Sequence, residues 1–466
     1  MRQLTLRVAL LLLCTLMHSL ALAQSVSGRL ASAFKTFQND PQLRNGIASL
    51  YVVDAKTGKV VFDQNSQLGL APASTQKIIT SASAYELLGD GFQYKTKFAL
   101  AKTGEEGKLL IMPTGDPTLG SWRWGNTKDE AVLKELTQAI SRQGVKHISS
   151  ITVDNEGWNE EAIPDGWMWQ DVGNYYGAGP AKLNWRENQF DVMLRSGKNI
   201  GDPVSIVGTV PELKGYKLRS ELSSAAAGTG DNAYIYFPVN GTTGVIRGTI
   251  PVNESRFKIS GALPAASDQF AGTLQDALTE AGIRSTGKVV VDSRGTANQQ
   301  AKYAPFYTVT SPSLDSIIYW FNRKSVNLYG EALLRTIGYQ KSGVGSTDAG
   351  VEAIQNLWKT RGIPETELNI VDGSGLSPLN RVTTQAQVKV LQHARKQPWF
   401  DGFYASLPLY NDMKMKSGTI RGVKGYTGYH KAKDGNEYVF SFLINNYNGS
   451  SGALVRKMYN VLDELK

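Results

Sequence analysis

The spacing of apolar and polar positions divides the chain into three regions. The first region has two predicted strands, 47–53 and 59–62, joined by a turn, and then a run of small and apolar residues from 78 to 88 that closes at Gly89. Such a run followed by glycine predicts a buried helix with a C-cap. From about residue 93 the pattern changes to short alternating strands with Gly, Asn and Thr turns. This second region contains strands at 148–154, 234–238 and 288–292 and one clear helix at 268–281.

The third region returns first to helices and then to strands. Helices are predicted at 313–322, 328–337 and 348–361, and a strand at 413–420 precedes a hairpin that turns at Asp434-Gly435. A strand at 438–445 and a helix at 452–465 complete it. We expect the outer regions to form one discontinuous α+β domain, 24–92 with 303–466, around an antiparallel sheet. The mostly β segment 93–302 is then an insert.

The N-terminus reads as a secretion signal. Arg2 and Arg7 precede an apolar run that continues to Ala21-Leu22-Ala23, which predicts a signal peptide over 1–23 and a secreted mature chain. No later segment is apolar enough to span a membrane, so we expect no transmembrane anchor. The only cysteine, Cys14, lies inside this leader. The mature chain therefore has no disulfide and no thiolate metal site, and four histidines without an H-E-x-x-H pattern argue against a zinc enzyme.

The net charge of +9 is moderate and includes the two arginines of the leader. Without a long basic run it does not indicate a nucleic-acid binder. It is compatible with an anionic polymer such as cell-wall glycan carrying peptide carboxylates, and equally with ordinary surface charge. A mature chain of about 440 residues exceeds one ordinary core, so two or three domains are expected.

Ser74 and Lys77 carry the most informative chemistry of the chain. They lie three residues apart at the start of the first predicted helix and share one face, so a deprotonated amine there could take the proton of the hydroxyl. The alternative is an N-cap serine with a surface lysine. Only this copy of the spacing follows a proline, Pro72, and precedes a long apolar helix. Three other copies exist: Ser32 with Lys35, Ser255 with Lys258, and Ser285 with Lys288.

Two further motifs complete an acyl-transfer set. Ser325-Val326-Asn327 lies between two predicted helices, where a hydroxyl and a carboxamide can point at Ser74. Lys416-Ser417-Gly418-Thr419 lies on a predicted strand, and Gly418 is expected to leave room for a substrate backbone. Two literal Lys-Thr-Gly triplets, at 56–58 and 102–104, fall in predicted turns. A serine followed by a second serine near asparagine and by a strand lysine is the set used by penicillin-recognising enzymes.

In this order the motifs resemble those of the low-molecular-mass class C penicillin-binding proteins, the D-alanyl-D-alanine carboxypeptidase/endopeptidase family. The likeness covers nearly the whole mature chain and includes segments 115–119, 183–188, 327–331 and 372–377. It implies a five-stranded antiparallel sheet flanked by helices, with two small inserted domains, the nested one near 208–262. It also implies a periplasmic enzyme without cofactor. Its substrates would be peptidoglycan stem peptides, cleaved at D-alanyl-D-alanine and at cross-links, and β-lactams would inhibit it.

The resemblance assigns the nucleophile and its base. Ser74 would be acylated by the penultimate D-alanine carbonyl, with Lys77 as general base. An ordinary lysine has a pKa of about 10.4, so the pKa of Lys77 must be lowered by burial and by a neighbouring positive charge. Lys416 is expected to supply that charge.

The resemblance also assigns the remaining roles. Ser325 would relay a proton to the leaving amine, Asn327 would orient the lysine and the substrate amide, and Lys416 with Thr419 would hold the terminal carboxylate. Backbone N–H groups of Ser74 and Thr419 would receive the oxyanion, each donor worth roughly 10²- to 10³-fold in rate.

Several positions depart from the family pattern. Ser417 replaces the usual threonine and keeps the hydroxyl, Pro378 stands where relatives often carry arginine, and Arg421 stands where glutamine is familiar. Asp171 matches an insert aspartate that in the family faces the ammonium of a diaminopimelate side chain. Its alternative is a turn aspartate beside Gly173.

Three other functions use parts of the same pattern. A class A β-lactamase needs a glutamate four residues before an asparagine, but Pro180 stands at that place before Asn184. An esterase of the same fold would turn over short-chain esters without cleaving D-alanyl-D-alanine. A non-catalytic wall-binding protein would lack a nucleophile or a lysine, whereas all the reactive residues are present here.

Overall fold

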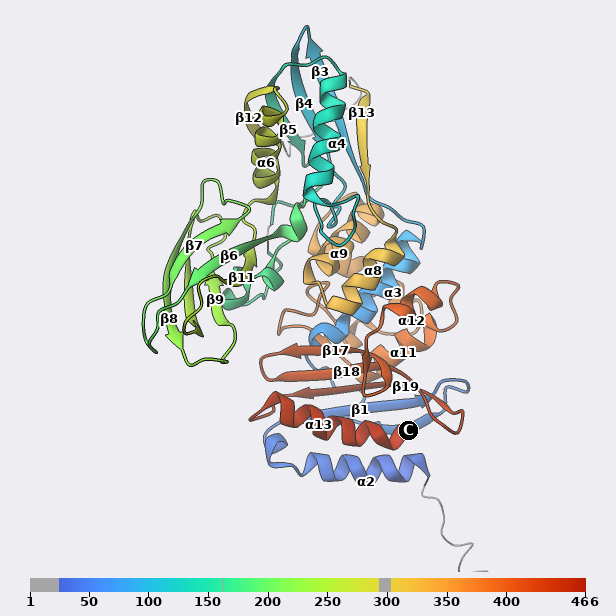
Figure 1. Cartoon of the computed structure of the whole chain (residues 1–466). Coiled ribbons are helices and arrows are strands. Elements are labelled where there is room, and N and C mark those ends of the chain that lie inside the picture. Colours follow the sequence, from blue (N-terminus) through green and yellow to red (C-terminus); the bar gives the residue numbers. More distant parts are fainter. Residues whose placement is uncertain (1–24, 162, 293–302) are drawn as a thin grey trace, which may run out of the picture.

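The computed structural model describes residues 25–161, 163–292 and 303–466. The predicted signal peptide, 1–23, lies outside the described residues. A six-stranded sheet lies toward one end of the molecule and a smaller mixed sheet at the other, with helices between them (Figure 1). Among the described residues, no helix combines the length and apolar character needed to cross a membrane.

The six-stranded sheet joins the two ends of the chain and is antiparallel throughout, in the order β16-β17-β18-β19-β1-β2. The eight residues of β1 pair with β19, from Ile47 opposite Asn445 to Asp54 opposite Tyr438. The central antiparallel sheet is therefore confirmed, and the two-residue β16 adds a strand to the expected five. Its strands are β1 (Ile47–Asp54), β2 (Val60–Gln64), β16 (Leu409–Tyr410), β17 (Met413–Ile420), β18 (Val423–Lys431) and β19 (Glu437–Asn445).

Helices cover both faces of this sheet, which makes an α+β layered fold. The helices α2 (Val26–Gln38) and α13 (Ser451–Leu462) lie on one face (Figure 1). Strand β1 alternates between the two cores, with Leu50 and Val52 packed toward α2 and α13 and Tyr51 and Val53 packed toward the opposite face. That opposite face carries α3 (Lys77–Leu88), α8 (Leu314–Lys324), α9 (Asn327–Ser342), α10 (Thr347–Lys359), α11 (Thr384–Ala394) and α12 (Phe400–Ser406).

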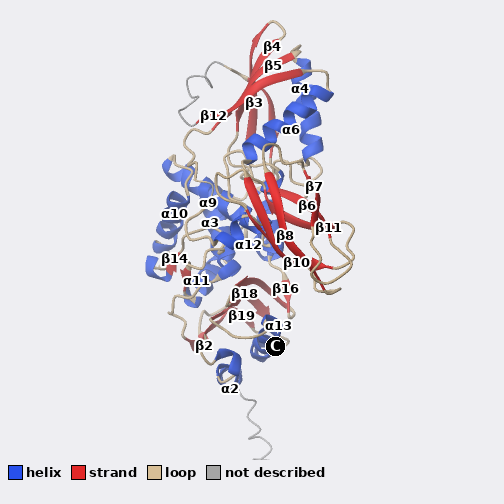
Figure 2. Cartoon of the chain, turned by 90° about the vertical axis from the view of Figure 1, so that its left-hand side faces the viewer, coloured by secondary structure: helices blue, strands red, loops and turns tan. Residues whose placement is uncertain are grey.

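The inserted region contains three more sheets around one shared core. A mixed five-stranded sheet has the order β12-β5-β4-β3-β13. Two three-stranded sheets, β8-β10-β9 and β11-β6-β7, lie to one side, at a level between the two larger sheets (Figure 2). The strands are β3 (Lys95–Thr103), β4 (Glu106–Met112), β5 (His147–Asp154), β6 (Gln189–Arg195), β7 (Ser205–Val210), β8 (Lys217–Ala225), β9 (Asn232–Tyr236), β10 (Thr243–Pro251), β11 (Phe257–Ala262), β12 (Arg284–Asp292) and β13 (Pro305–Thr310).

Two elements of this region differ from the sequence prediction. Strand β13, which we expected within the catalytic region, pairs with β3 in the mixed sheet. Besides the expected helix, now α6 (Ala266–Glu280), there is a second long helix, α4 (Asp129–Arg142). Its buried face holds Val132, Leu136 and Ile140, a four-residue spacing that was visible in the sequence.

A buried carboxylate ties the insert to the helices of the catalytic region. Glu187 is fully buried and accepts hydrogen bonds from Arg123 Nε, Ser121 Oγ and Tyr329 Oη, each at 2.7 Å. Tyr329 belongs to α9, whereas the other residues belong to the insert. This contact joins the segments 183–188 and 327–331, which are distant in the sequence.

Candidate active site

Ser74 lies in a single 3-10 turn, Ala73–Gln76, that runs directly into α3. The sequence predicted Ser74 at the helix start, and the structure places it in this preceding turn. Ala73 has a φ of 47°, in the left-handed region, so the turn is held by its surroundings. The helix that follows is buried and ends at Gly89, as expected.

Lys77 is the first residue of α3 and has no exposed surface. Its Nζ lies 2.9 Å from Ser74 Oγ, 2.7 Å from Asn327 Oδ1 and 2.6 Å from the Ser374 carbonyl oxygen. Burial lowers the pKa of Lys77 to about 7, because the charged amine is costly to hold away from water. At neutral pH a substantial fraction of this amine is unprotonated.

The charges around Lys77 differ from those expected. Asp372 and Glu331 act on the pKa of Lys77 in the opposite direction to burial and raise it. Lys416 was expected to lower the pKa of Lys77. Instead, burial and the charge of Lys77 lower the pKa of Lys416. The expected lowering by burial is therefore found, whereas the expected lowering by the charge of Lys416 is not.

The second serine and the strand lysine meet beside this pair. Lys416, only 1% exposed, donates from Nζ to Ser325 Oγ at 3.1 Å and to the Ser417 carbonyl oxygen at 2.8 Å. Ser325 caps the end of α8 with φ 58° and ψ 38°, an uncommon conformation for a residue with a side chain. Asn327 begins α9 and donates to the Tyr176 carbonyl oxygen at 2.8 Å, so its amide oxygen is left facing Lys77.

The structure gives a reason for glycine at position 418 that differs from the one the sequence suggested. A Cβ at this position would lie 2.6 Å from the Pro72 carbonyl oxygen, 2.9 Å from Thr75 N and 3.0 Å from Ser74 N. The space beside Gly418 is therefore filled by the backbone of the nucleophile turn. The glycine lets β17 pack directly against that turn.

A cleft of about 750 Å³ opens over these groups. Of the predicted site residues, those that line it are Ser74, Ser325, Asn327, Thr419, Asp171 and Arg421. The other four, Lys77, Lys416, Ser417 and Gly418, are not among its lining residues in the described parts of the chain. Asp171, in the short helix α5 (Trp169–Val172), is half-buried and accepts a hydrogen bond from Tyr176 Oη at 3.2 Å. Burial raises the pKa of Asp171.

The chain that carries this geometry matches a protein-family model over most of its length. A model described as the D-Ala-D-Ala carboxypeptidase 3 (S13) family matches residues 30–465. The chain belongs to this family. Its members are serine D-Ala-D-Ala carboxypeptidases, so the family assignment and the enzyme class predicted from the motifs are confirmed.

Individual relatives span most of this S13 protein. A D-alanyl-D-alanine carboxypeptidase of Actinomadura sp. (strain R39) is 25% identical, covering 96% of this chain and 87% of the relative. The DacB carboxypeptidase of Haemophilus influenzae is 25% identical over 86% of this chain and 85% of its own. The crystal structure of penicillin binding protein 4 (dacB) from Haemophilus influenzae superposes with a TM-score of 0.79 at 22% identity, covering 93% of this chain and 99% of that one. The fold class is confirmed.

A loop at 372–377, which the sequence analysis named only as part of the family resemblance, also contacts the active site of the S13 protein. In the segment 372–377, the Ser374 carbonyl oxygen contacts Lys77, and Asp372 Oδ2 accepts a hydrogen bond from Trp167 Nε1 at 3.0 Å. Glu331 accepts from Gly373 N at 2.9 Å, and burial raises the pKa of Glu331. A backbone carbonyl has no signature in the sequence, so spacing alone could not have identified this contact.

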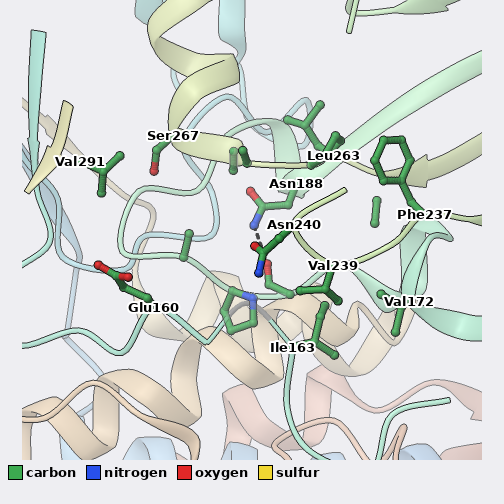
Figure 3. A pocket seen from close by; sticks show the side chains of 18 of the residues that line it. Glu160, Ile163, Val172, Asn188, Phe237, Val239, Asn240, Leu263, Ser267 and Val291 are labelled. Carbon is green, nitrogen blue, oxygen red and sulfur yellow. Dashed lines mark hydrogen bonds between the residues drawn. The ribbon is translucent and has the colours of Figure 1, made fainter. Parts of the chain in front are cut away.

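A second cavity of about 310 Å³ lies within the insert. Figure 3 shows Ile163, Val172, Phe237 and Leu263 around it, with Glu160 at one side. None of the predicted site residues lines this cavity. The reactive groups of the S13 protein therefore gather only around the larger cleft, within the described residues.

Proposed function

We propose that this S13 carboxypeptidase is a periplasmic serine DD-peptidase that cleaves D-alanyl-D-alanine, and also peptide cross-links, in peptidoglycan. The observation that carries the proposal is the position of the Lys77 amine, which lies 2.9 Å from Ser74 Oγ in a fully buried site. A buried amine with a pKa of about 7 is a base matched to neutral pH. Such a pair activates a serine without histidine.

In the first step, Ser74 Oγ attacks the carbonyl carbon of the penultimate D-alanine and its proton passes to Lys77 Nζ. The unprotonated amine accepts that proton, while Asn327 and the Ser374 carbonyl oxygen hold the resulting ammonium through the contacts at 2.7 and 2.6 Å. The tetrahedral oxyanion is received by the backbone N–H groups of Ser74 and Thr419, which both line the cleft.

In the second step, the C–N bond breaks and the leaving amine takes the proton that Lys77 accepted, relayed through Ser325 Oγ, so that Lys77 is unprotonated again. Lys416 Nζ, 3.1 Å from Ser325 Oγ, keeps that hydroxyl in place and favours transfer of its proton. Water then attacks the acyl-serine carbon and gives a proton to Lys77, which returns it to Ser74 Oγ as the C–O bond to the serine breaks and the shortened peptide leaves. Each proton therefore has a residue that accepts it and a residue that returns it.

Substrate recognition involves both ends of the cleft. Lys416 and Thr419 are assigned to the terminal carboxylate, and Arg421, which lines the cleft with Thr419, adds a further positive charge. Asp171 is assigned to an ammonium group on the third residue of the stem peptide. β-Lactams would acylate Ser74 as substrate mimics, in line with the crystal structure of the Haemophilus influenzae protein in complex with a β-lactam, which superposes at a TM-score of 0.74.

Mass spectrometry after treatment with a β-lactam tests the proposal. We expect one adduct on the peptide that contains Ser74, and no adduct in Lys77→Ala. The matched alternatives are the other serines that precede a lysine by three residues, of which Ser32 lies on the exposed side of α2. An adduct on Ser32, Ser255 or Ser285, or no adduct with any β-lactam, would contradict the proposal.

A further inference from the structure

Lys424 lies beside the strand motif on the neighbouring strand. In the antiparallel pairing of β17 with β18, Lys424 is opposite Thr419. Its Nζ donates a hydrogen bond to Thr419 Oγ1 at 2.7 Å and lies 5.6 Å from the centre of the Tyr426 ring. The side chain is partly buried, and burial lowers the pKa of Lys424. This amine is therefore held in a fixed place beside the cleft.

The positive charges at this end of the cleft have no acidic partner. In the described part of the chain, no carboxylate forms an ion pair with Lys416, Lys424 or Arg421. The charge of Lys424 also contributes to lowering the pKa of Lys416. Buried or partly buried cations without counterions are costly, and an arriving anion relieves that cost.

The hydrogen bond also determines which way the Thr419 hydroxyl can point. An ammonium only donates, so the hydroxyl oxygen accepts from Lys424 and its own hydrogen must point elsewhere. Thr419 lines the cleft, where that hydrogen can be donated to a ligand. A hydroxyl that accepts from a cation is a stronger donor, because hydrogen bonds in a chain polarise one another.

We propose that Lys424 is a positioning residue for substrate carboxylate: it orients and polarises the Thr419 hydroxyl and adds a second positive charge behind it. The inference rests on the proposed function, because the ligand is the terminal carboxylate of the peptide or the carboxylate of a β-lactam. The motif at 416–419 does not contain this lysine. Only the strand pairing brings it to the motif.

The test compares a penicillin with its methyl ester, which lacks the carboxylate. Second-order acylation rates are measured for wild type and Lys424→Met with both compounds. We expect the variant to lose about tenfold with the acid and little with the ester, the loss typical of a hydrogen bond to a charged group. Lys424→Arg should restore most of the acid rate. Lys431→Met is the matched control, since Lys431 is exposed at the far end of β18.

The outcomes separate this inference from the proposed function. If wild type is not acylated by either compound, the proposed function fails. If wild type is acylated and Lys424→Met loses equally with acid and ester, or with neither, Lys424 is structural and the inference is overturned. Thermal melting of each variant identifies a folding defect. In that case Lys424→Gln, which keeps a polar head near Thr419 without the charge, is judged by the same acid-to-ester ratio.

Discussion

Replacing Gly418 by alanine tests how closely the strand motif packs against the nucleophile turn. The added Cβ would lie 2.6 Å from the Pro72 carbonyl oxygen, whereas ordinary contact begins near 3.4 Å, so backbone must move by about 0.8 Å. The atoms in the way belong to the main chain of Pro72, Ser74 and Thr75, and they cannot rotate aside. The turn that carries the nucleophile is the part that has to shift.

The size of the expected effect follows from that displacement. A misplacement of about 1 Å at a reacting group costs roughly 10²-fold in rate, and overpacking of this kind costs about 1–3 kcal/mol of stability. Gly418→Ala should therefore lower the rate constant for acylation by roughly 10²-fold. Its melting temperature should fall by a few degrees while the protein stays folded.

The assay is acylation by fluorescent penicillin over a range of concentrations, which separates binding from the chemical step. Gly208→Ala is the control, because a Cβ at Gly208 in β7 meets nothing within 4 Å. An acylation rate constant equal to that of wild type would refute the packing argument. If binding weakened while the chemical step was unchanged, Gly418 would instead serve to admit the substrate backbone.

Three further predictions concern single residues of the site. Lys416→Ala should lower second-order acylation by at least about 10²-fold, whereas Lys56→Ala, in an exposed turn, and Lys102→Ala, exposed near the end of β3 and not in the predicted turn, should not; equal losses in all three would mean that the strand motif is misplaced. Asp171→Asn should lower kcat/KM by about tenfold for peptides with an ammonium on the third residue and not for peptides without it; equal loss on both would return Asp171 to a structural role. Because Lys77 acts unprotonated and its pKa is lowered to about 7, acylation should fall as pH drops below 7 and level off above it, and a profile without this limb would exclude Lys77 as the base.

The three motifs were predictable because each depends on short-range order. The 3-10 turn that runs into α3 brings Ser74 and Lys77 together across three residues, and strand alternation places Lys416 on an edge of the site. Likewise, the strand β1 was predicted correctly because both of its faces are buried, which gives a largely apolar run in the sequence.

The remaining features depend on contacts between distant segments. Glycine is needed at position 418 because the backbone of a turn more than three hundred residues earlier in the chain packs against it. The contact of Lys77 with the Ser374 carbonyl oxygen involves a backbone atom, which has no signature in the sequence. The sequence analysis correctly expected burial to lower the pKa of Lys77, but it also expected a contribution from Lys416 and did not foresee the opposing charges of Asp372 and Glu331, which only the folded chain brings close. Strand β13 was misplaced for a similar reason, since only its pairing with β3 distinguishes it from a strand of the catalytic sheet.

The pairing of β1 with β19 has a consequence for how the chain folds. As the chain is synthesised, β1 and β2 appear first, all strands of the insert sheets follow by Thr310, and β19 appears near the end. Pairings between such distant segments form slowly, because a very long loop must close first. Until then one edge of β1 stays open to association with other chains. A chain that stops before β17 lacks Lys416 and Thr419, so penicillin binding would report that synthesis has passed this strand and that the two ends of the chain have come together at the site.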